Sequence, residues 1–96
     1  MLEKFTVATF APHLGTRFQV QQDGLPIALE LFEATPYAEQ PASGRVPFSV
    51  MFRGPNQPVL PQRIYTLAHA TLGEFALFLV PIGPDDQGMR YEAVFT

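Results

Sequence analysis

The C-terminal third of the chain constrains the fold most, because it contains two strand-like segments separated by a turn. The segment Glu74–Pro84 is apolar at nearly every position, which is typical of a strand buried on both faces. The segment Met89–Phe95 alternates apolar and polar residues, which is typical of a strand with one solvent-exposed face. Residues 85–88, between them, are acidic and amide-bearing and end in glycine, as turns often do. The pattern predicts a β-hairpin.

Ten prolines and seven glycines divide the rest of the chain into short segments. None of these segments shows a long 3.6-residue periodicity, and several alternate with a period of two and are rich in aromatic and β-branched residues. Asp23-Gly24 is a strong signal for a two-residue hairpin turn, whereas residues 36–45 have the composition of an exposed loop. Four further strands are expected, at Thr16–Gln22, Ile27–Thr35, Pro47–Arg53 and Arg63–His69.

The N-terminal segment Thr6–Gly15 is the one candidate for a helix. Thr9 is expected to cap a short helical turn, with Pro12 tolerated in the first turn and Gly15 as a left-handed stop. An edge strand starting at Thr6 is the alternative. In the helical interpretation, the side chains that fold onto the core are those of Phe5, Val7, Phe10 and Leu14.

The short connections favour antiparallel pairing, since a parallel pair needs a long crossover. We therefore expect an all-β fold: a single domain over residues 1–96, in which a small antiparallel meander of about six strands closes as a barrel or a sandwich. If an edge strand is left open, at Thr16–Gln22 or Pro47–Arg53, it offers a site for pairing with another chain.

The composition argues against several function classes. Nine acidic residues against six basic ones give a net charge of -3, and the basic residues are scattered, so nucleic acid is not an expected partner. The absence of cysteine excludes disulfides, zinc–thiolate sites and thiol catalysis. The start of the chain lacks a signal-peptide pattern, and the apolar run Phe75–Ile82 is shorter than the ~20 residues of a membrane helix. A soluble cytoplasmic protein is expected.

No catalytic, cofactor or metal site is expected, because the chain lacks a phosphate loop, a paired-histidine motif and a nucleophile elbow. We interpret His69 as a histidine packed beside a turn and hydrogen-bonded to backbone, with a ligand-binding role as the alternative. His13 lies in the predicted helical turn. A hydrolase that uses His69 with an acid such as Glu92 is the weakest hypothesis. Residues 85–88 are interpreted as a turn rather than a calcium loop.

Charged residues inside predicted strands have two interpretations. Glu30, Arg53, Arg90 and Glu92 are expected to form cross-strand pairs on the solvent-exposed face. The sharper alternative is a polar patch that binds a ligand.

The loop Gly54–Pro61 has a more unusual pattern. Its three prolines are three residues apart, which places them on one face of a polyproline helix, and two apolar residues lie within the same loop. In one interpretation the loop folds back and closes one end of the barrel. In the other it is a stiff contact surface for a protein partner, formed by Pro55, Pro58, Val59, Leu60 and Pro61.

Several motifs together resemble a known family. They include Phe52–Pro55, Pro58–Gln62, Leu77–Pro81 and Gly88–Phe95, with Thr9–Pro12 near the N-terminus. These motifs are similar to those of short bacterial proteins described only as a domain of unknown function, the DUF6916-like proteins. The resemblance covers nearly the whole chain and brings no catalytic residues. It implies a small bacterial domain with an accessory or assembly role, in a phage-tail-like context.

These observations favour a non-enzymatic interaction module that binds a protein partner or a second copy of itself. The alternative is a barrel that binds a small apolar ligand in its interior, because nine phenylalanines and three tyrosines could line such a pocket.

Overall fold

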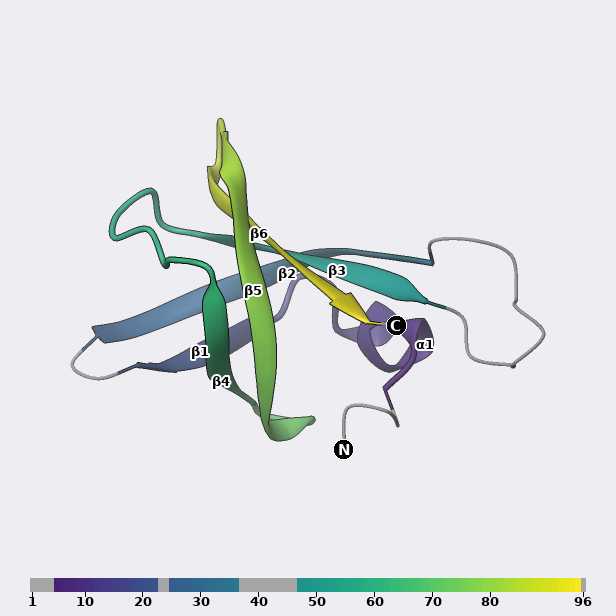
Figure 1. Ribbon diagram of the computed structural model, residues 1–96. Helices are drawn as coiled ribbons and strands as arrows, with labels where there is room; N and C mark the ends of the chain where they lie inside the picture. The colour runs from purple at the N-terminus through teal and green to yellow at the C-terminus, as the bar shows by residue number, and fades with distance from the viewer. Residues whose placement is uncertain (1–4, 23–24, 37–46, 96) are drawn as a thin grey trace.

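The predicted hairpin is part of a closed antiparallel barrel of six strands, shown in the computed structural model of Figure 1. The structure describes residues 5–22, 25–36 and 47–95. A short helix α1 (Val7–Phe10) and a 3-10 turn η2 (Ala11–His13) come first. The strands are β1 (Arg17–Gln22), β2 (Leu25–Pro36), β3 (Phe48–Gly54), β4 (Arg63–His69), β5 (Gly73–Asp85) and β6 (Gly88–Phe95). The all-β prediction is confirmed, and the fold is a barrel rather than a sandwich.

The order of the strands around the barrel is β1-β2-β3-β6-β5-β4, so the chain is not one simple meander. The first three strands form one meander and the last three form another, with β3 beside β6 and β1 beside β4. The segment between β3 and β4, residues 55–62, therefore crosses from one half of the barrel to the other. The turn predicted at Asp23-Gly24 lies outside the described residues. Of the loop predicted at residues 36–45, only Pro36 is described.

Barrel closure removes the free edges that were predicted. The strand β1 pairs with β2 and β4, and β3 pairs with β2 and β6. The prediction of an open edge strand at Thr16–Gln22 or Pro47–Arg53 is therefore wrong, because closing a sheet gives each strand two neighbours. Short unpaired lengths of strand remain where a ladder covers only part of the two strands that form it.

Alternate residues of the strands point inward and fill the barrel. On β2 and β3 the inward residues are buried, and β1 contributes Phe18 and Val20. Aromatic rings dominate one end, where the rings of Phe48 and Phe95 stack with centroids 4.4 Å apart. The buried residues of β2 and β3 are Ile27, Leu29, Leu31, Phe48, Val50 and Phe52.

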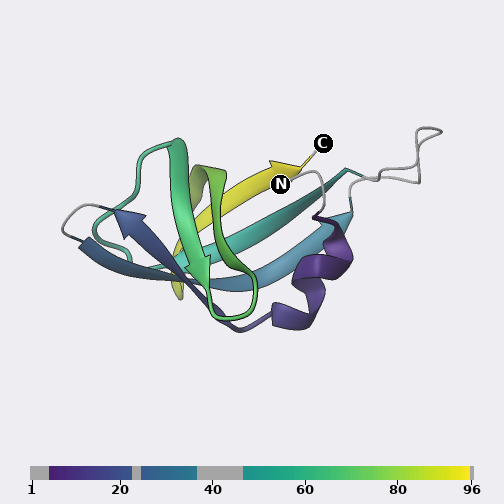
Figure 2. The ribbon, with the colours of Figure 1, turned by 90° about the horizontal axis from the view of Figure 1, so that it is seen from below.

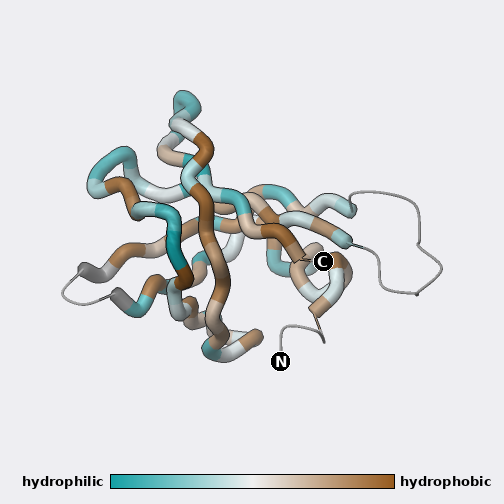
Figure 3. Tube along the Cα trace, viewed as in Figure 1, coloured by the Kyte–Doolittle hydropathy of each residue, from teal (hydrophilic) through white to brown (hydrophobic). Residues whose placement is uncertain are grey.

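The strand β5 departs from its prediction, because only one of its faces is buried. Phe75, Leu77 and Leu79 point inward and are buried, whereas Phe78 is 48% exposed. Its register partner on β4, Ile64, is 64% exposed. The outer face of a barrel wall faces solvent, so an apolar sequence is no guarantee of burial on both sides. Figure 3 shows this hydrophobic run of β5 in brown.

The helical interpretation of the N-terminus is confirmed, but its details differ from the prediction. The residue before the helix is Thr6, and the hydroxyl of Thr9 accepts a hydrogen bond from the backbone N–H of Thr6 at 3.0 Å. Thr9 is thus the third residue of the helix rather than its cap. Leu14 is exposed, whereas Gly15 has the predicted left-handed conformation, with φ of 85°.

The helix α1 lies beside the end of β2 and the start of β3, as Figure 2 shows. The β5–β6 ladder ends at Val80–Glu92, so the two strands separate beyond this point. Rings from the N-terminal segment pack there: Phe10 lies 6.2 Å from Phe75 and 5.4 Å from Phe95 between ring centroids. The helix therefore completes the core where the strands diverge. No helix among the described residues is long and apolar enough to cross a membrane.

The opposite end of the barrel requires glycine. A Cβ added to Gly88 would meet the carbonyl oxygen of Gly54, and one added to Gly54 would meet the side chain of Leu29. Gly88 also has a positive φ of 148°. Strands β3 and β6 can approach this closely only without a side chain at Gly88, and the absence of one at Gly54 leaves room for the side chain of Leu29.

We expect Gly88→Ala to destabilise the fold by about 2 kcal/mol or more, because backbone strain adds to the steric overlap. Gly73→Ala is the matched control: Gly73 has a φ of 80°, but an added Cβ there meets nothing within 4 Å. That control should cost about 1 kcal/mol, from the backbone conformation alone. Urea unfolding of both variants measures the difference, and equal losses would contradict the close approach.

Candidate functional site

An open pocket of about 550 Å³ lies between β2 and the loop that follows β3. Its volume is within the range of ligand-binding pockets. One wall consists of residues of β1 and β2, and the other of the loop itself. The lining residues are Arg17, Ile27, Ala28, Glu30, Arg53, Gly54, Pro55, Gln57, Pro58 and Gln87.

Two tyrosines fix the loop that forms the second wall. The backbone N–H of Leu60 donates a hydrogen bond of 2.8 Å to the hydroxyl of Tyr91, and the hydroxyl of Tyr65 donates one of 2.6 Å to the carbonyl of Pro61. Burial raises the pKa of Tyr65, so it remains the protonated donor at neutral pH. The loop is thus anchored to the barrel at two adjacent residues, Leu60 and Pro61.

The loop combines the two interpretations made from the sequence. Leu60 is 4% exposed and belongs to the core, so it closes this end of the barrel and is not available as a surface contact. Val59 is 47% exposed. The chain bends at residues 56–58, so the prolines do not form the predicted polyproline helix. The partner-contact prediction remains for Pro55, Pro58, Val59 and Pro61, of which the first two line the pocket.

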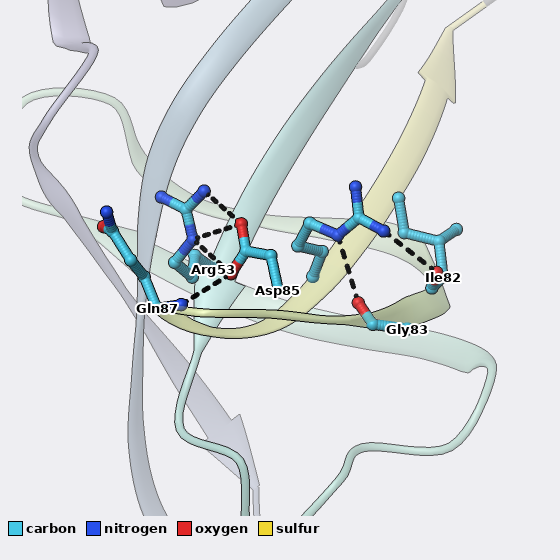
Figure 4. A network of polar contacts seen from close by, with 6 residues as sticks. Arg53, Ile82, Gly83, Asp85 and Gln87 are labelled. Carbon is cyan, nitrogen blue, oxygen red and sulfur yellow. Dashed lines mark hydrogen bonds and ion pairs between the residues drawn. The ribbon is translucent and has the colours of Figure 1, made fainter.

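An ion pair holds the floor of the pocket to the β5–β6 turn (Figure 4). Arg53 donates from Nη2 to Asp85 at 2.6 Å and from Nε to both carboxylate oxygens at 3.2 Å. Its guanidinium also lies over the ring of Phe32, 4.0 Å from the centroid. The hydrogen bond from Arg53, followed by one from the backbone N–H of Gln87, lowers the pKa of Asp85 to about 2. The predicted turn at residues 85–88 is therefore tied to β3 by Asp85.

The predicted cross-strand pairing of charges is only partly realised. Glu30 does lie opposite Arg53 in the β2–β3 register, and Arg17 lies opposite Glu30 in the β1–β2 register. However, the close partner of Arg53 is Asp85, the last residue of β5. Arg90 lies opposite Arg53 and donates instead to the backbone carbonyls of Gly83, at 3.1 Å, and Ile82, at 3.5 Å. These bonds are drawn in Figure 4.

His69 has the predicted structural environment. Its Nδ1 accepts hydrogen bonds from the backbone N–H groups of Thr71, at 3.0 Å, and Leu72, at 3.2 Å. Since Nδ1 accepts, the ring proton lies on Nε2, which is 2.9 Å from the hydroxyl of Thr16. That hydroxyl donates in turn to the carbonyl of His13 at 2.6 Å. The neutral imidazole thus links the β4–β5 turn to the N-terminal segment.

Two features around His69 were beyond sequence reasoning. The ring of His13 packs against it with centroids 4.8 Å apart, although the residues are far apart in sequence. Burial, and then the charge of His13, lower the pKa of His69. The structure gives no support to the pairing of His69 with Glu92, whose register partners are Met51 and Val80. Among the described residues, no group of three metal-ligating side chains gathers around this histidine pair.

The barrel interior is occupied by its own side chains. A single cluster of buried residues from all six strands, from α1 and from the loop after β3 fills it. Small barrels are commonly filled in this way. The pocket therefore lies outside the barrel, where Arg17, Glu30 and Arg53 come together from three strands.

Comparison with known proteins places the chain in a family. A family model described as a domain of unknown function (DUF6916) matches residues 5–95. The chain therefore belongs to the DUF6916 family. No curated protein and no solved structure matches it.

We expect Asp85→Asn to lower the melting temperature at pH 7, since it removes the carboxylate that pairs with Arg53. A folded-state pKa of about 2, below the ordinary value of 3.8, contributes stability above pH 4 that is lost as pH falls toward 2. The gap between wild type and variant should therefore shrink over that window. Asp86→Asn is the control, because it removes the same charge from the same turn. A constant gap from pH 7 to pH 2 would argue against the ion pair.

The lowered pKa of His69 predicts a second pH dependence. The folded state favours the neutral ring, so its stability is full above the unfolded pKa of about 6.5 and falls as pH drops through the lower folded pKa. Chemical unfolding at pH 7.5 and pH 5 should show a larger loss for wild type than for His69→Gln. His13→Gln serves as the comparison variant, because it keeps the buried ring of His69. The idea fails if wild type and His69→Gln lose equal stability on acidification.

Proposed function

We propose that this DUF6916 domain is a non-enzymatic interaction module that holds a segment of a protein partner in the pocket between β2 and the loop after β3. The observation that carries the proposal is the pocket itself, whose second wall is the loop with the predicted partner contacts Pro55 and Pro58. Val59 and Pro61 extend this exposed surface beyond the pocket.

The pocket wall is preformed, which favours binding. The bonds of Tyr65 and Tyr91 anchor the loop at Leu60 and Pro61, and the ion pair with Asp85 orients Arg53 before a partner arrives. A site whose groups are already ordered loses less conformational entropy on binding. The lining also combines apolar side chains with a few charged and amide groups, the mixture that gives a binding site both affinity and orientation.

The packed interior weighs against the alternative of a small apolar ligand inside the barrel. The resemblance to proteins encoded near phage-tail-like components supports an accessory or assembly role for the module. In this proposal the domain acts in the bacterial cytoplasm, without catalysis and without nucleic acid or membrane as its partner.

The test uses a phage-displayed library of random linear peptides, selected on the immobilised wild-type protein. Ala28→Arg places a long side chain in the pocket, and Ala76→Arg places the same side chain on the exposed outer face of β5. Selected peptides should bind Ala28→Arg at least about tenfold more weakly and Ala76→Arg unchanged, because only the first fills the site. Thermal unfolding checks that both variants fold. An empty selection, or equal binding to all three proteins, would overturn the proposal.

A further inference from the structure

The strand β2 has an unpaired stretch of backbone beside the pocket. Its ladder with β1 begins at Leu25, but its ladder with β3 begins only at the pair Glu30–Arg53. The first part of β2, residues 25–28, therefore has a strand neighbour on one side among the described residues. The other side faces the loop that forms the pocket wall.

The hydrogen-bonding pattern shows which backbone groups face the pocket. The N–H of Leu31 donates to the carbonyl of Thr16, and its carbonyl accepts from the N–H of Gly15, so Leu31 faces β1. In an antiparallel ladder the direction alternates from one residue to the next. The odd-numbered residues of β2 up to Leu31 thus bond toward β1, and the N–H and C=O of Ala28 point away from β1, toward the loop. Pro26, two residues earlier, faces the same side as Ala28. A proline suits this unpaired side, because it has no N–H that needs a partner.

Proline also explains why β3 does not cover this edge. Continuing the register of Glu30–Arg53 by two residues would place Pro55 opposite Ala28. Pro55 has no N–H to donate, and the chain bends away at residues 56–58. On the side that faces the loop, the described residues therefore supply no strand partner for Ala28, whose small side chain lines the pocket with Arg17 and Glu30.

We propose that the partner segment binds as an added strand, hydrogen-bonded to the N–H and C=O of Ala28 and enclosed by Pro55 and Pro58. This inference rests on the proposed function and specifies its mode. The occupant is an extended peptide, because free strand-edge groups on one wall of a pocket match the backbone of an extended chain.

The lining sets the side-chain preference of such a peptide. Successive residues of a strand point to opposite faces. Residues on one face of the added strand meet Ile27 and the prolines, and residues on the other meet Arg17 and Glu30. A segment that alternates apolar and polar residues fits both.

The test applies N-methylation, one amide at a time, to a peptide selected from the random library. N-methylation removes a donor and blocks strand pairing on that side of the backbone. Affinity should fall about tenfold or more at alternate residues that face β2 and change little at those between. In the protein, hydrogen exchange of the Ala28 amide, followed by NMR, should slow about tenfold or more on binding.

The outcomes separate this inference from the proposed function. Uniform tolerance of N-methylation with unchanged Ala28 exchange, while Ala28→Arg still blocks the peptide, overturns strand addition and leaves the pocket as a binding site. Failure of every peptide to bind overturns both. Self-association of the wild type that Ala28→Arg abolishes, with no peptide bound, would overturn the peptide as occupant in favour of a second copy of this chain.

Discussion

Six strands enclose an interior that only side chains can fill, and the packing of phenylalanine rings around Phe10 meets this requirement at the end where β5 and β6 separate. Phe10 is fully buried and contacts rings from the N-terminal segment, β1, β3, β5 and β6. The short helix has too few residues to be stable alone. It persists because this ring is the piece of the core that the strands do not provide.

The other end of the barrel is closed by different means, and these create the binding surface. Leu60 enters the core there, and the bond from its N–H to Tyr91 holds the loop over the barrel end. Because the loop must cross from β3 to β4, it leaves the edge of β2, and the pocket opens between them. The loop between β3 and β4 thus closes the interior and leaves part of β2 without a neighbour on one side. The candidate site therefore lies on the barrel wall and not inside the barrel.

Sequence reasoning succeeded where the physical cause is local. Alternation with period two located the strands and their inward faces, and Gly15 gave the helix stop. It failed where the cause lies between distant segments. The apolar sequence of β5 does not reveal that nothing among the described residues covers Phe78, and the pocket depends on a register that aligns Arg17, Glu30 and Arg53. The partners of Asp85 and His69 lie 32 and 53 residues away in the chain.

The ladders of this barrel differ in length, and we call the shortest one, between β1 and β4, the seam. Strands β1 and β4 pair only at Gln19–Ala68 and Val20–Leu67, whereas β3–β6 and β4–β5 pair along the full length of β3 and β4. The hydrogen bond between His69 and Thr16 lies beside this short ladder and adds a link between the end of β4 and the residue before β1. We expect local opening of the native state to begin at this seam, because it is the ladder with the fewest paired residues. Such an opening would separate β1 from β4, while the long ladder between β3 and β6 keeps the two meanders joined.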